Sequence, residues 1–479
     1  MATPDPLRPP ESVRGVLATL WRNGHAAFLV GGGVRDELLG RRARDWDVTT
    51  DAPPDRLVTL FPRGRIDNAF GTVTVPFDGD DEGGDDIDHV EVTTFRRDHV
   101  YTDHRRPHSV TFTDDLGEDL LRRDFTVNAI AWGKPALAPD QEPLTDPAWV
   151  DPTHGLADLE TRTLRAVGVP AERFEEDALR LLRGARLAAQ LDFEIEPATL
   201  AGMAAAAETI SFVSRERVGE ETRRMLEADQ PSRAFELLAT TGVLEHALPS
   251  FAKQRGIPQD KAPGMDLWAH SMATVDAAAQ MRPPGDLLRL AALVHDIGKP
   301  ETFADGHFIG HDTVGAEQAE ELLSGLVFPR RDTSRVVELV RNHMFSYEPR
   351  WSGAAVRRFI RRVGRDLVDD LIDLRAADNL GSGLPANAGH LDELRKRVHA
   401  ELESGAPLTL ADLAVNGRDL VTELGLDQGP LIGDVLEQLL GDVVADPAAN
   451  TRTELLDRAR EWLTEELKAH GNRATGRQS

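Results

Sequence analysis

The sequence predicts an α+β protein in which a small mixed α/β head precedes an all-α body. Short apolar or alternating segments typical of strands lie within residues 12–160. From about residue 172 onward, apolar residues recur at helical spacing instead. The 479 residues also exceed what one hydrophobic core usually holds, so we expect two to four domains.

The head begins with a helix and continues as short strands that alternate with turns and a second helix. Its expected strands and their connections follow in chain order: AAFLV at 26–30, three glycines with the helix start VRDELLG at 34–40, DWDVTT at 45–50, VTVPF at 73–77 and HVEVTTF at 89–95. The acidic run 78–88 between the last two is expected to be a solvated loop. FTVNAIAW at 125–132 is compatible with a further strand or with a helix start.

The body is expected to be helical, as in RFEEDALRLLRGARLAAQL at 173–191. Pro263-Gly264 marks a boundary, and the Gly/Pro cluster at 381–389 marks a loop. The expected domains are the head at 12–160, a helical neck at 161–250, helical domains at 265–400 and 401–467, and a disordered tail at 468–479.

The composition excludes several classes of protein. No run of eighteen apolar residues occurs, so we expect no membrane span, and no secretory signal is visible at the N-terminus. The absence of cysteine excludes disulfides, Cys-ligated zinc and Cys nucleophiles, and it fits a cytoplasmic protein.

The net charge of −26 argues against a protein that coats nucleic acid along its whole surface. However, arginines cluster in the first half of the chain, for example Arg122 with Arg123 and Arg215 with Arg217. Because the guanidinium fork suits phosphate, a phosphate-rich ligand could dock there in spite of the global charge.

Asp45 and Asp47 lie two residues apart in the expected strand DWDVTT, so their carboxylates would point to the same face. Two like charges at close range need a cation, and Mg²⁺ prefers oxygen ligands. Glu91 on HVEVTTF could supply a third carboxylate to such a site, which would suit two-metal nucleotidyl transfer. The alternative is that both aspartates are ordinary carboxylates at a strand edge.

Two later segments carry polar residues that suit a nucleotide. In LRRDFTVNAIA, Arg123 could hold triphosphate charge, and Asp124 or Asn128 could hold a ribose hydroxyl; the alternative is a helix cap with surface arginines. In EEDALRLLR, Asp177 and Arg180 would be i,i+3 neighbours on one helix; the alternative is a solvated salt-bridge stripe.

The ordered series of these motifs resembles one family over residues 12–250. The motifs are GGGVRDELLGR, DWDVTT, VEVTTFRRD, YTDHRRPHSVTF, LRRDFTVNAIA, DPTHGLADLETRTLRAVG and RFEEDALRLLRGARLAAQLDFEI. Together they are similar to the class II (bacterial-type) CCA tRNA nucleotidyltransferase and poly(A) polymerase family. Residues 408–465 resemble the C-terminal helical segment of the same family, which implies a part in holding tRNA.

The resemblance implies a role for each matching residue. Asp45 and Asp47 would be the catalytic Mg²⁺ ligands, with Glu91 the candidate for the third carboxylate. Nucleotide-binding roles would fall to Gly32, Gly33, Arg35, Arg123, Asp124, Asn128, Asp177, Arg180 and Arg183. Asp177 and Arg180 would read the base, and Glu176 and Arg183 would orient that pair.

Four histidines and two aspartates of the helical half stand out because each lies in or beside an apolar helical segment, although each could simply be packed in the core. Their surroundings, above all HDIGK, resemble the HD phosphohydrolase superfamily. The resemblance implies a one-metal ligand set of His270, His295, Asp296 and Asp378, with His311 and His343 added in two-metal members. The metal would be a transition metal, Mn²⁺ or Mg²⁺, and Lys299 could contact a phosphate. A relic domain without chemistry is the alternative.

The leading hypothesis is therefore addition of CMP and AMP, from CTP and ATP, to the tRNA 3′ end. A poly(A) polymerase, or an enzyme that adds only CC or only A, would keep the same chemistry. An HD phosphohydrolase whose N-terminal half only binds RNA is the alternative from another class. Oligomeric state does not follow from the sequence.

Overall fold

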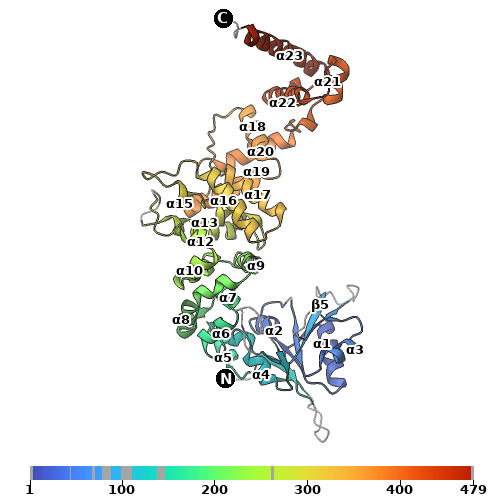
Figure 1. Ribbon diagram of the computed structural model, residues 1–479, viewed down its shortest axis with the longest axis vertical. Coiled ribbons are helices and arrows are strands. Elements are labelled where there is room, and N and C mark those ends of the chain that lie inside the picture. The colour runs from blue at the N-terminus through green and yellow to red at the C-terminus, as the bar shows by residue number, and fades with distance from the viewer. Residues whose placement is uncertain are drawn as a thin grey trace. The chain divides into compact units, whose positions relative to one another are not determined.

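The chain divides into two units, Met1–Lys253 and Gln254–Ser479, which are described separately below (Figure 1). The computed structural model describes residues 4–43, 45–66, 71–77, 88–98, 110–136, 146–259, 261 and 264–475.

A sheet of seven strands forms the centre of the head among the described residues, in the order β3-β4-β5-β2-β1-β8-β9. The strands are β1 Ala27–Val30, β2 Asp47–Thr50, β3 Arg65–Ile66, β4 Thr72–Pro76, β5 His89–Thr94, β8 Ala131–Lys134 and β9 Ala148–Val150. The β2–β5 pair is parallel, whereas the other neighbours are antiparallel. The mixed sheet expected for the head is therefore confirmed.

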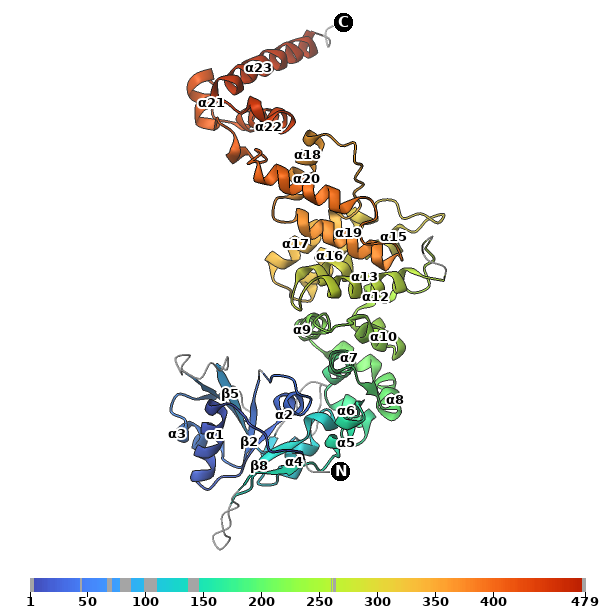
Figure 2. The same cartoon turned by 180° about the vertical axis from the view of Figure 1, so that it is seen from behind.

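Helices and small ladders complete the head. The helices are α1 Glu11–Arg22, α2 Gly31–Leu38, α3 Pro54–Leu60, α4 Leu116–Leu121, α5 Gly155–Glu160 and the 3₁₀ helix η1 Thr126–Asn128. The ladders pair β6 Arg96–Asp98 with β7 Val110–Phe112 and β10 Thr163–Leu164 with β11 Glu194–Ile195. In Figures 1 and 2, α1 and α3 lie next to one another beside the sheet. All four residues of β1 are buried, which fits its position inside the sheet between β2 and β8.

Two local expectations need correction, and a third, which left two forms open, is resolved. The strand DWDVTT starts only at Asp47, so Asp45 lies in the preceding loop. Helix α2 already begins at Gly31, so the three glycines form its first turn rather than a loop before it. FTVNAIAW combines both expected forms, because η1 precedes the strand β8. Residues 78–87 of the acidic run lie outside the described residues, while the flanking strands β4 and β5 pair as expected.

The neck is helical, as expected. Its elements are α6 Pro170–Glu176, α7 Leu179–Leu191, α8 Pro197–Ala205, the 3₁₀ helix η2 Ala207–Phe212, α9 Arg215–Met225, α10 Ser232–Thr240, α11 Val243–Ala247 and α12 Pro249–Ala252. The expected single helix over 173–191 is in fact broken, because Asp177 adopts an extended conformation with φ −138° and ψ 102°. Its carboxylate accepts a hydrogen bond from the Leu179 backbone N–H, which starts α7.

The second unit is built from helices throughout its described residues (Figure 2). They are α13 Leu267–Met281, α14 Leu287–Val294, α15 Lys299–Thr302, α16 His311–Gly325, α17 Arg330–Asn342, α18 Gly353–Val363, α19 Val368–Gly381, α20 Leu391–Glu403, α21 Gly417–Leu424, α22 Pro430–Ala445 and α23 Arg452–Thr475, with 3₁₀ turns η3 Leu410–Asp412 and η4 Pro447–Ala449. Figures 1 and 2 both show α13, α16, α17 and α19 as neighbours.

The last helices have a hydrophobic core of their own, which includes Leu420 of α21, Leu439 of α22 and Leu455 of α23. Helix α23 continues to Thr475, so residues 468–475, for which the sequence suggests disorder, are helical; residues 476–479 lie outside the described residues. Within the part of the chain that the structure describes, no helix combines the length and apolar content that crossing a membrane requires.

Candidate active site and metal centre

Three carboxylates gather where β2 and β5 run side by side. Asp47 is in register with Glu91 on the parallel neighbour, and the Glu91 N–H donates to the Trp46 carbonyl at 3.3 Å. Register partners on neighbouring strands point to the same face, so Glu91 lies beside Asp47 as the sequence suggested. Asp45 and Glu91 are exposed and Asp47 is partly buried, whereas Trp46 is buried in the core. Ligands can therefore reach these carboxylates.

The glycines of α2 leave space for this site. Gly31 adopts φ +79°, and a Cβ there would lie 2.7 Å from Asp47 Oδ2. At Gly33, a Cβ would lie 2.6 Å from the Asp45 carbonyl oxygen and 3.3 Å from the Trp46 ring. A side chain at either position would displace one of the two aspartates. Packing alone therefore explains why Gly31 and Gly33 are glycines, independently of any phosphate.

Positive charge lies next to the carboxylates. A Cβ at Gly31 would also lie 3.4 Å from Arg123 Nη1, so this guanidinium flanks the first turn of α2. Nε of Arg123 is buried and has no hydrogen-bond partner among the described residues. Burial raises the pKa of Asp47; the charge of Arg123 opposes this rise, and that of Asp45 adds to it. A pair of crowded carboxylates fits a divalent cation, and the N-terminus of a helix beside Arg123 fits phosphate oxygens.

A network around Asp124 holds three more of the expected residues together. Arg183 donates to Asp124 Oδ2 from Nε at 2.8 Å, and Asn128 Nδ2 donates to Oδ1 at 3.1 Å. Arg35 Nη1 in turn donates to Asn128 Oδ1 at 2.7 Å. Burial alone would raise the pKa of Asp124, but Arg183 and the Asn128 hydrogen bond hold it well below its ordinary value. Asp124 is therefore ionised and fixed in place.

The base-reading candidates are arranged differently from the expectation. Glu176 accepts from Arg180 Nη1 at 2.7 Å, an i,i+4 contact that spans the helix break. Arg180 also donates to the Arg122 carbonyl at 3.1 Å. The Asp177 carboxylate instead lies 3.4 Å from Nη2 of Arg217 on α9. Arg183, which was expected to orient the pair, contacts Asp124 instead.

Sequence reasoning missed two contributors in the first unit. Asp119 on α4 is completely buried, accepts from Arg122 Nε at 2.9 Å and lies 3.6 Å from Arg123 Nη2. Its i,i+3 and i,i+4 spacing to the two arginines was the available signal. Arg217 belongs to an arginine cluster visible in the sequence, but its contact with Asp177 spans 40 residues and has no local signature.

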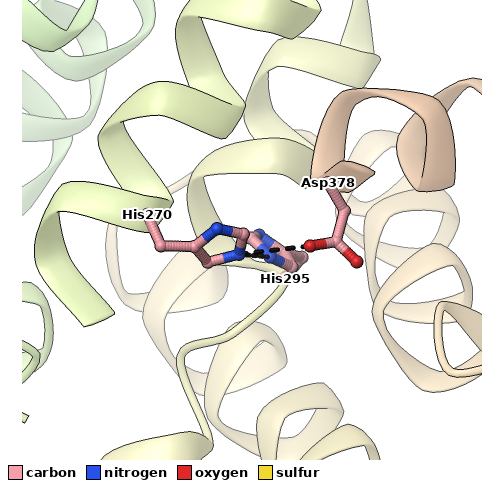
Figure 3. Close-up of side chains that lie close together, drawn as sticks. All are labelled: His270, His295 and Asp378. Atoms are coloured by element: carbon pink, nitrogen blue, oxygen red, sulfur yellow. Dashed lines mark hydrogen bonds and ion pairs between the residues drawn. The ribbon is translucent and has the colours of Figure 1, made fainter. Parts of the chain in front are cut away.

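In the second unit, six buried residues from separate helical segments form one cluster. His270 lies on α13, His295 and Asp296 follow α14, His311 begins α16, His343 follows α17 and Asp378 lies on α19. The structure thus brings together the whole expected set, in two groups that could each hold a metal ion: His270, His295 and Asp378, and Asp296, His311 and His343. We call them the first and second subsites. Figure 3 shows the three side chains of the first subsite pointing toward one another.

Distances within the cluster suit metal ligands. In the first subsite His270 Nε2 lies 3.2 Å from His295 Nε2 and 3.2 Å from Asp378 Oδ1. Asp296 connects the subsites, since Oδ2 lies 3.2 Å from His295 Nε2 and Oδ1 lies 3.6 Å from Nε2 of both His311 and His343. Neighbouring ligands of one ion with bonds of about 2.1–2.3 Å lie roughly 3 Å apart, so these spacings fit.

The histidine tautomers support the same interpretation. Nδ1 lies 2.8 Å from the Ala292 carbonyl oxygen in His295, and 2.6 Å from the Phe308 and Val340 carbonyls in His311 and His343. A ring that donates through Nδ1 presents the Nε2 lone pair to the cluster. The Nε2 atoms of His311 and His343 lie only 3.3 Å apart, so their lone pairs face one another. A cation between them would relieve that repulsion.

Charge and burial shift the pKa values of the cluster residues in opposite directions. Burial lowers the pKa of His295 and of His311, which keeps these rings neutral and able to bind metal. Burial would raise the pKa of Asp296, but its contacts with His295, Lys299 and His270 hold it well below its ordinary value. His295 and His311 therefore offer neutral imidazole beside the ionised Asp296. Burial would also lower the pKa of His270, but its hydrogen bonds with Asp296 and Asp378 raise it.

Comparisons with known proteins identify the domains. Residues 27–165 match the Poly A polymerase head domain, residues 192–255 match the probable RNA and SrmB-binding site of polymerase A, and residues 267–382 match the HD domain.

Similar proteins match over most of their length. A CCA-adding enzyme of Levilactobacillus brevis is 33% identical over 93% of this chain and 96% of its own. An A-adding tRNA nucleotidyltransferase of Deinococcus radiodurans is 33% identical over 86% of this chain and 90% of its own. The crystal structure of the Bacillus stearothermophilus CCA-adding enzyme in complex with CTP is 26% identical, covers 97% of this chain and 100% of that chain, and has a TM-score of 0.66. With the head, the RNA-binding segment and the HD domain in this order, the chain belongs to the CCA-adding enzyme family of class II nucleotidyltransferases.

Proposed function

We propose that the protein adds CMP and AMP to the 3′ end of tRNA, to build or repair the terminal CCA. The observation that carries this proposal is the juxtaposition of Asp45, Asp47 and Glu91 with Arg123 and the first turn of α2. The 3′-hydroxyl loses its proton and its oxygen forms a bond to the α-phosphorus of the nucleotide. The bond from that phosphorus to the bridging oxygen breaks, and pyrophosphate leaves.

Each group of residues has a distinct task in this proposal. Asp45 and Asp47, with Glu91 as the third carboxylate, hold Mg²⁺, which when bound lowers the pKa of the attacking hydroxyl and neutralises charge on the leaving pyrophosphate. Arg123, whose Nε has no hydrogen-bond partner in the described chain, binds triphosphate oxygens together with Gly32, Gly33 and the α2 N-terminus. Arg35, Asn128 and Arg183 hold Asp124 ionised, so that it can accept a hydrogen bond from a ribose hydroxyl.

Selection of the base rests on Asp177 and Arg180. Cytosine and adenine both place an exocyclic amine next to a ring-nitrogen acceptor. A carboxylate can accept from the amine while a guanidinium donates to the ring nitrogen, whereas uracil and guanine present a carbonyl at the amine position. Each residue has a partner that fixes it: Arg217 lies against Asp177, and Glu176 against Arg180.

A narrower product is the second candidate in this class. The Deinococcus radiodurans relative is an A-adding enzyme and is as similar in identity as the Levilactobacillus brevis one. Addition of A alone, CC alone or a poly(A) tail would use the same carboxylates and the same base-reading pair, so only the product distinguishes these activities.

We also propose that the HD domain is a metal-dependent phosphohydrolase that acts on RNA ends or small phosphoesters. Its metal would be Mn²⁺, Mg²⁺ or a transition metal. The completeness and burial of the six-residue cluster favour this activity over a relic domain. Lys299 Nζ lies 2.6 Å from Asp296 Oδ2 and is suitably placed to meet a phosphate. We further propose a cytoplasmic location, where tRNA and nucleoside triphosphates are found. We also propose the division into head, neck and two helical domains that the sequence suggests, with boundaries near 160, 250, 265 and 400.

The test uses purified protein, Mg²⁺ and tRNA that lacks its CCA, with each labelled nucleoside triphosphate supplied alone and in pairs. Incorporation from CTP, then from ATP only after CTP, with a stop after three nucleotides, supports CCA addition. Addition of A only to tRNA that already ends in CC supports the A-adding alternative. Long A-tails support a poly(A) polymerase. Failure to incorporate any nucleotide, combined with phosphate release from RNA ends, would leave the HD phosphohydrolase with an RNA-binding head.

A further inference from the structure

A lysine ammonium lies among the ligands of the first metal subsite. Lys261 Nζ is 2.8 Å from His270 Nε2 and 3.2 Å from Asp378 Oδ1. These two atoms are also 3.2 Å from one another, so the ammonium contacts the same donor atoms that a metal ion would bind. The Lys261 side chain is mostly buried, at 20% exposure.

The two subsites differ in their relation to positive charge. Lys261 contacts Asp378, a ligand of the first subsite. Lys299 contacts Oδ2 of Asp296, the oxygen that faces His270 and His295 of the same subsite. In the second subsite, Nε2 of His311 and Nε2 of His343 face each other and Asp296 Oδ1. A divalent cation that enters the first subsite must move an ammonium away from its ligands, because two positive charges cannot share them at this distance.

We propose that Lys261 is a tethered competitor for the first subsite, so that the centre binds two divalent ions with unequal affinity, the second subsite filling first. Lys261 thereby determines how much metal the HD domain needs before both subsites are occupied. The inference rests on the proposed metal centre, and it concerns Lys261 rather than the ligands themselves. The Lys261 contact with Asp378 spans 117 residues, and no motif in the sequence marks it.

The test is a Mn²⁺ titration of the full-length protein, with free Mn²⁺ followed by electron paramagnetic resonance. Asp47→Asn serves as the parent so that the head contributes no competing site. The parent should show two tight sites of unequal affinity. Lys261→Met, which keeps the length of the side chain without its charge, should strengthen the weaker site at least tenfold, or about 1.4 kcal/mol. Lys396→Met, an equal change of charge at an exposed position of α20, should leave both sites unchanged.

A double-mutant cycle assigns the effect. With Asp378→Asn in place the weaker site should be lost, and Lys261→Met should then have no further effect on Mn²⁺ binding. Lys261→Gln serves as a second neutral variant, and circular dichroism checks that each variant is folded. Identical two-site curves for the parent and both Lys261 variants would overturn this inference alone. Weaker Mn²⁺ binding in the Lys261 variants would also overturn it. A lack of tight Mn²⁺ binding in every protein would overturn the metal centre and this inference with it.

Discussion

Gly31→Ala is the substitution that most directly probes how the fold positions Asp47. The added Cβ would lie 2.7 Å from Asp47 Oδ2, and the residue would have to keep φ +79°. The backbone conformation alone costs an alanine about 1–2 kcal/mol. To reach ordinary van der Waals contact the carboxylate must also move by about 0.7 Å, so we expect a total loss of about 2–3 kcal/mol in the free energy of unfolding.

The same displacement should impair the chemistry more than the fold. A misplacement of 1 Å at a reacting centre can cost about a hundredfold in rate, so Gly31→Ala should lower the rate of nucleotide addition by at least tenfold. The assay is single-turnover addition to tRNA lacking CCA, together with urea unfolding. Hydrolysis by the HD domain, if present, should be unaffected.

Two neighbouring glycines supply matched controls for stability. Gly40 has φ +68° with open space around its Cβ, so Gly40→Ala isolates the cost of the left-handed backbone. Gly32 has no positive φ, and its Cβ would make an ordinary 3.5 Å contact with Arg35, so Gly32→Ala should cost less than about 1 kcal/mol. If Gly31→Ala destabilises the protein no more than Gly40→Ala, and addition keeps its normal rate, the proposed dependence of Asp47 on Gly31 is refuted.

Three further predictions address the two sites and the buried Asp124. Asp47→Ala should abolish nucleotide addition and spare HD hydrolysis, whereas His295→Ala should do the reverse; loss of both activities in both variants would contradict two independent sites. Arg180→Ala should relax the choice among the four nucleotides, measured as kcat/KM for each, and an equal loss with all four would refute a base-reading role. Asp124→Asn should destabilise the protein by about 2 kcal/mol at neutral pH, a moderate value for a buried carboxylate whose partner Arg183 is 38% exposed. The pKa of Asp124 in the folded protein lies below the ordinary 3.8, so its contribution to the free energy of unfolding is complete above about pH 4 and is lost as the pH falls through the folded pKa. Unfolding should therefore be measured at pH 3–8. The difference in free energy of unfolding between Asp124→Asn and the unchanged protein should narrow only at the acid end.

Much of the fold follows from local sequence patterns, and where the fold differs from the expectation the cause is local. Alternation identified the strands that became β4 and β5, which pair with one another, and the pairing of β5 with β2 brought Glu91 into register with Asp47. The break between α6 and α7 could not be predicted, because the apolar spacing continues across it. What ends the helix is the Asp177 side chain, which accepts from the Leu179 backbone and meets Arg217 from another helix.

For the candidate sites, the sequence likewise predicted some features and not others. Motifs found all six members of the histidine–aspartate cluster, since each lies in a recognisable helical context and the fold brings them within 4.8 Å of their group members. The pairing of Arg183 with Asp124 spans 59 residues, and that of Lys261 with Asp378 spans 117. Such partners are chosen by tertiary packing, so the sequence offered the residues but not their contacts.

We propose that one head, which reads bases through amino acids alone, builds a defined trinucleotide. It is tested most directly by the intact mass of a tRNA that lacks its CCA, after incubation with the protein, Mg²⁺ and all four nucleoside triphosphates at once. We expect one product, heavier by two CMP and one AMP, which Asp47→Ala should fail to form. A product that contains UMP or GMP, an A-tail of variable length, or unchanged tRNA with the intact protein would contradict it.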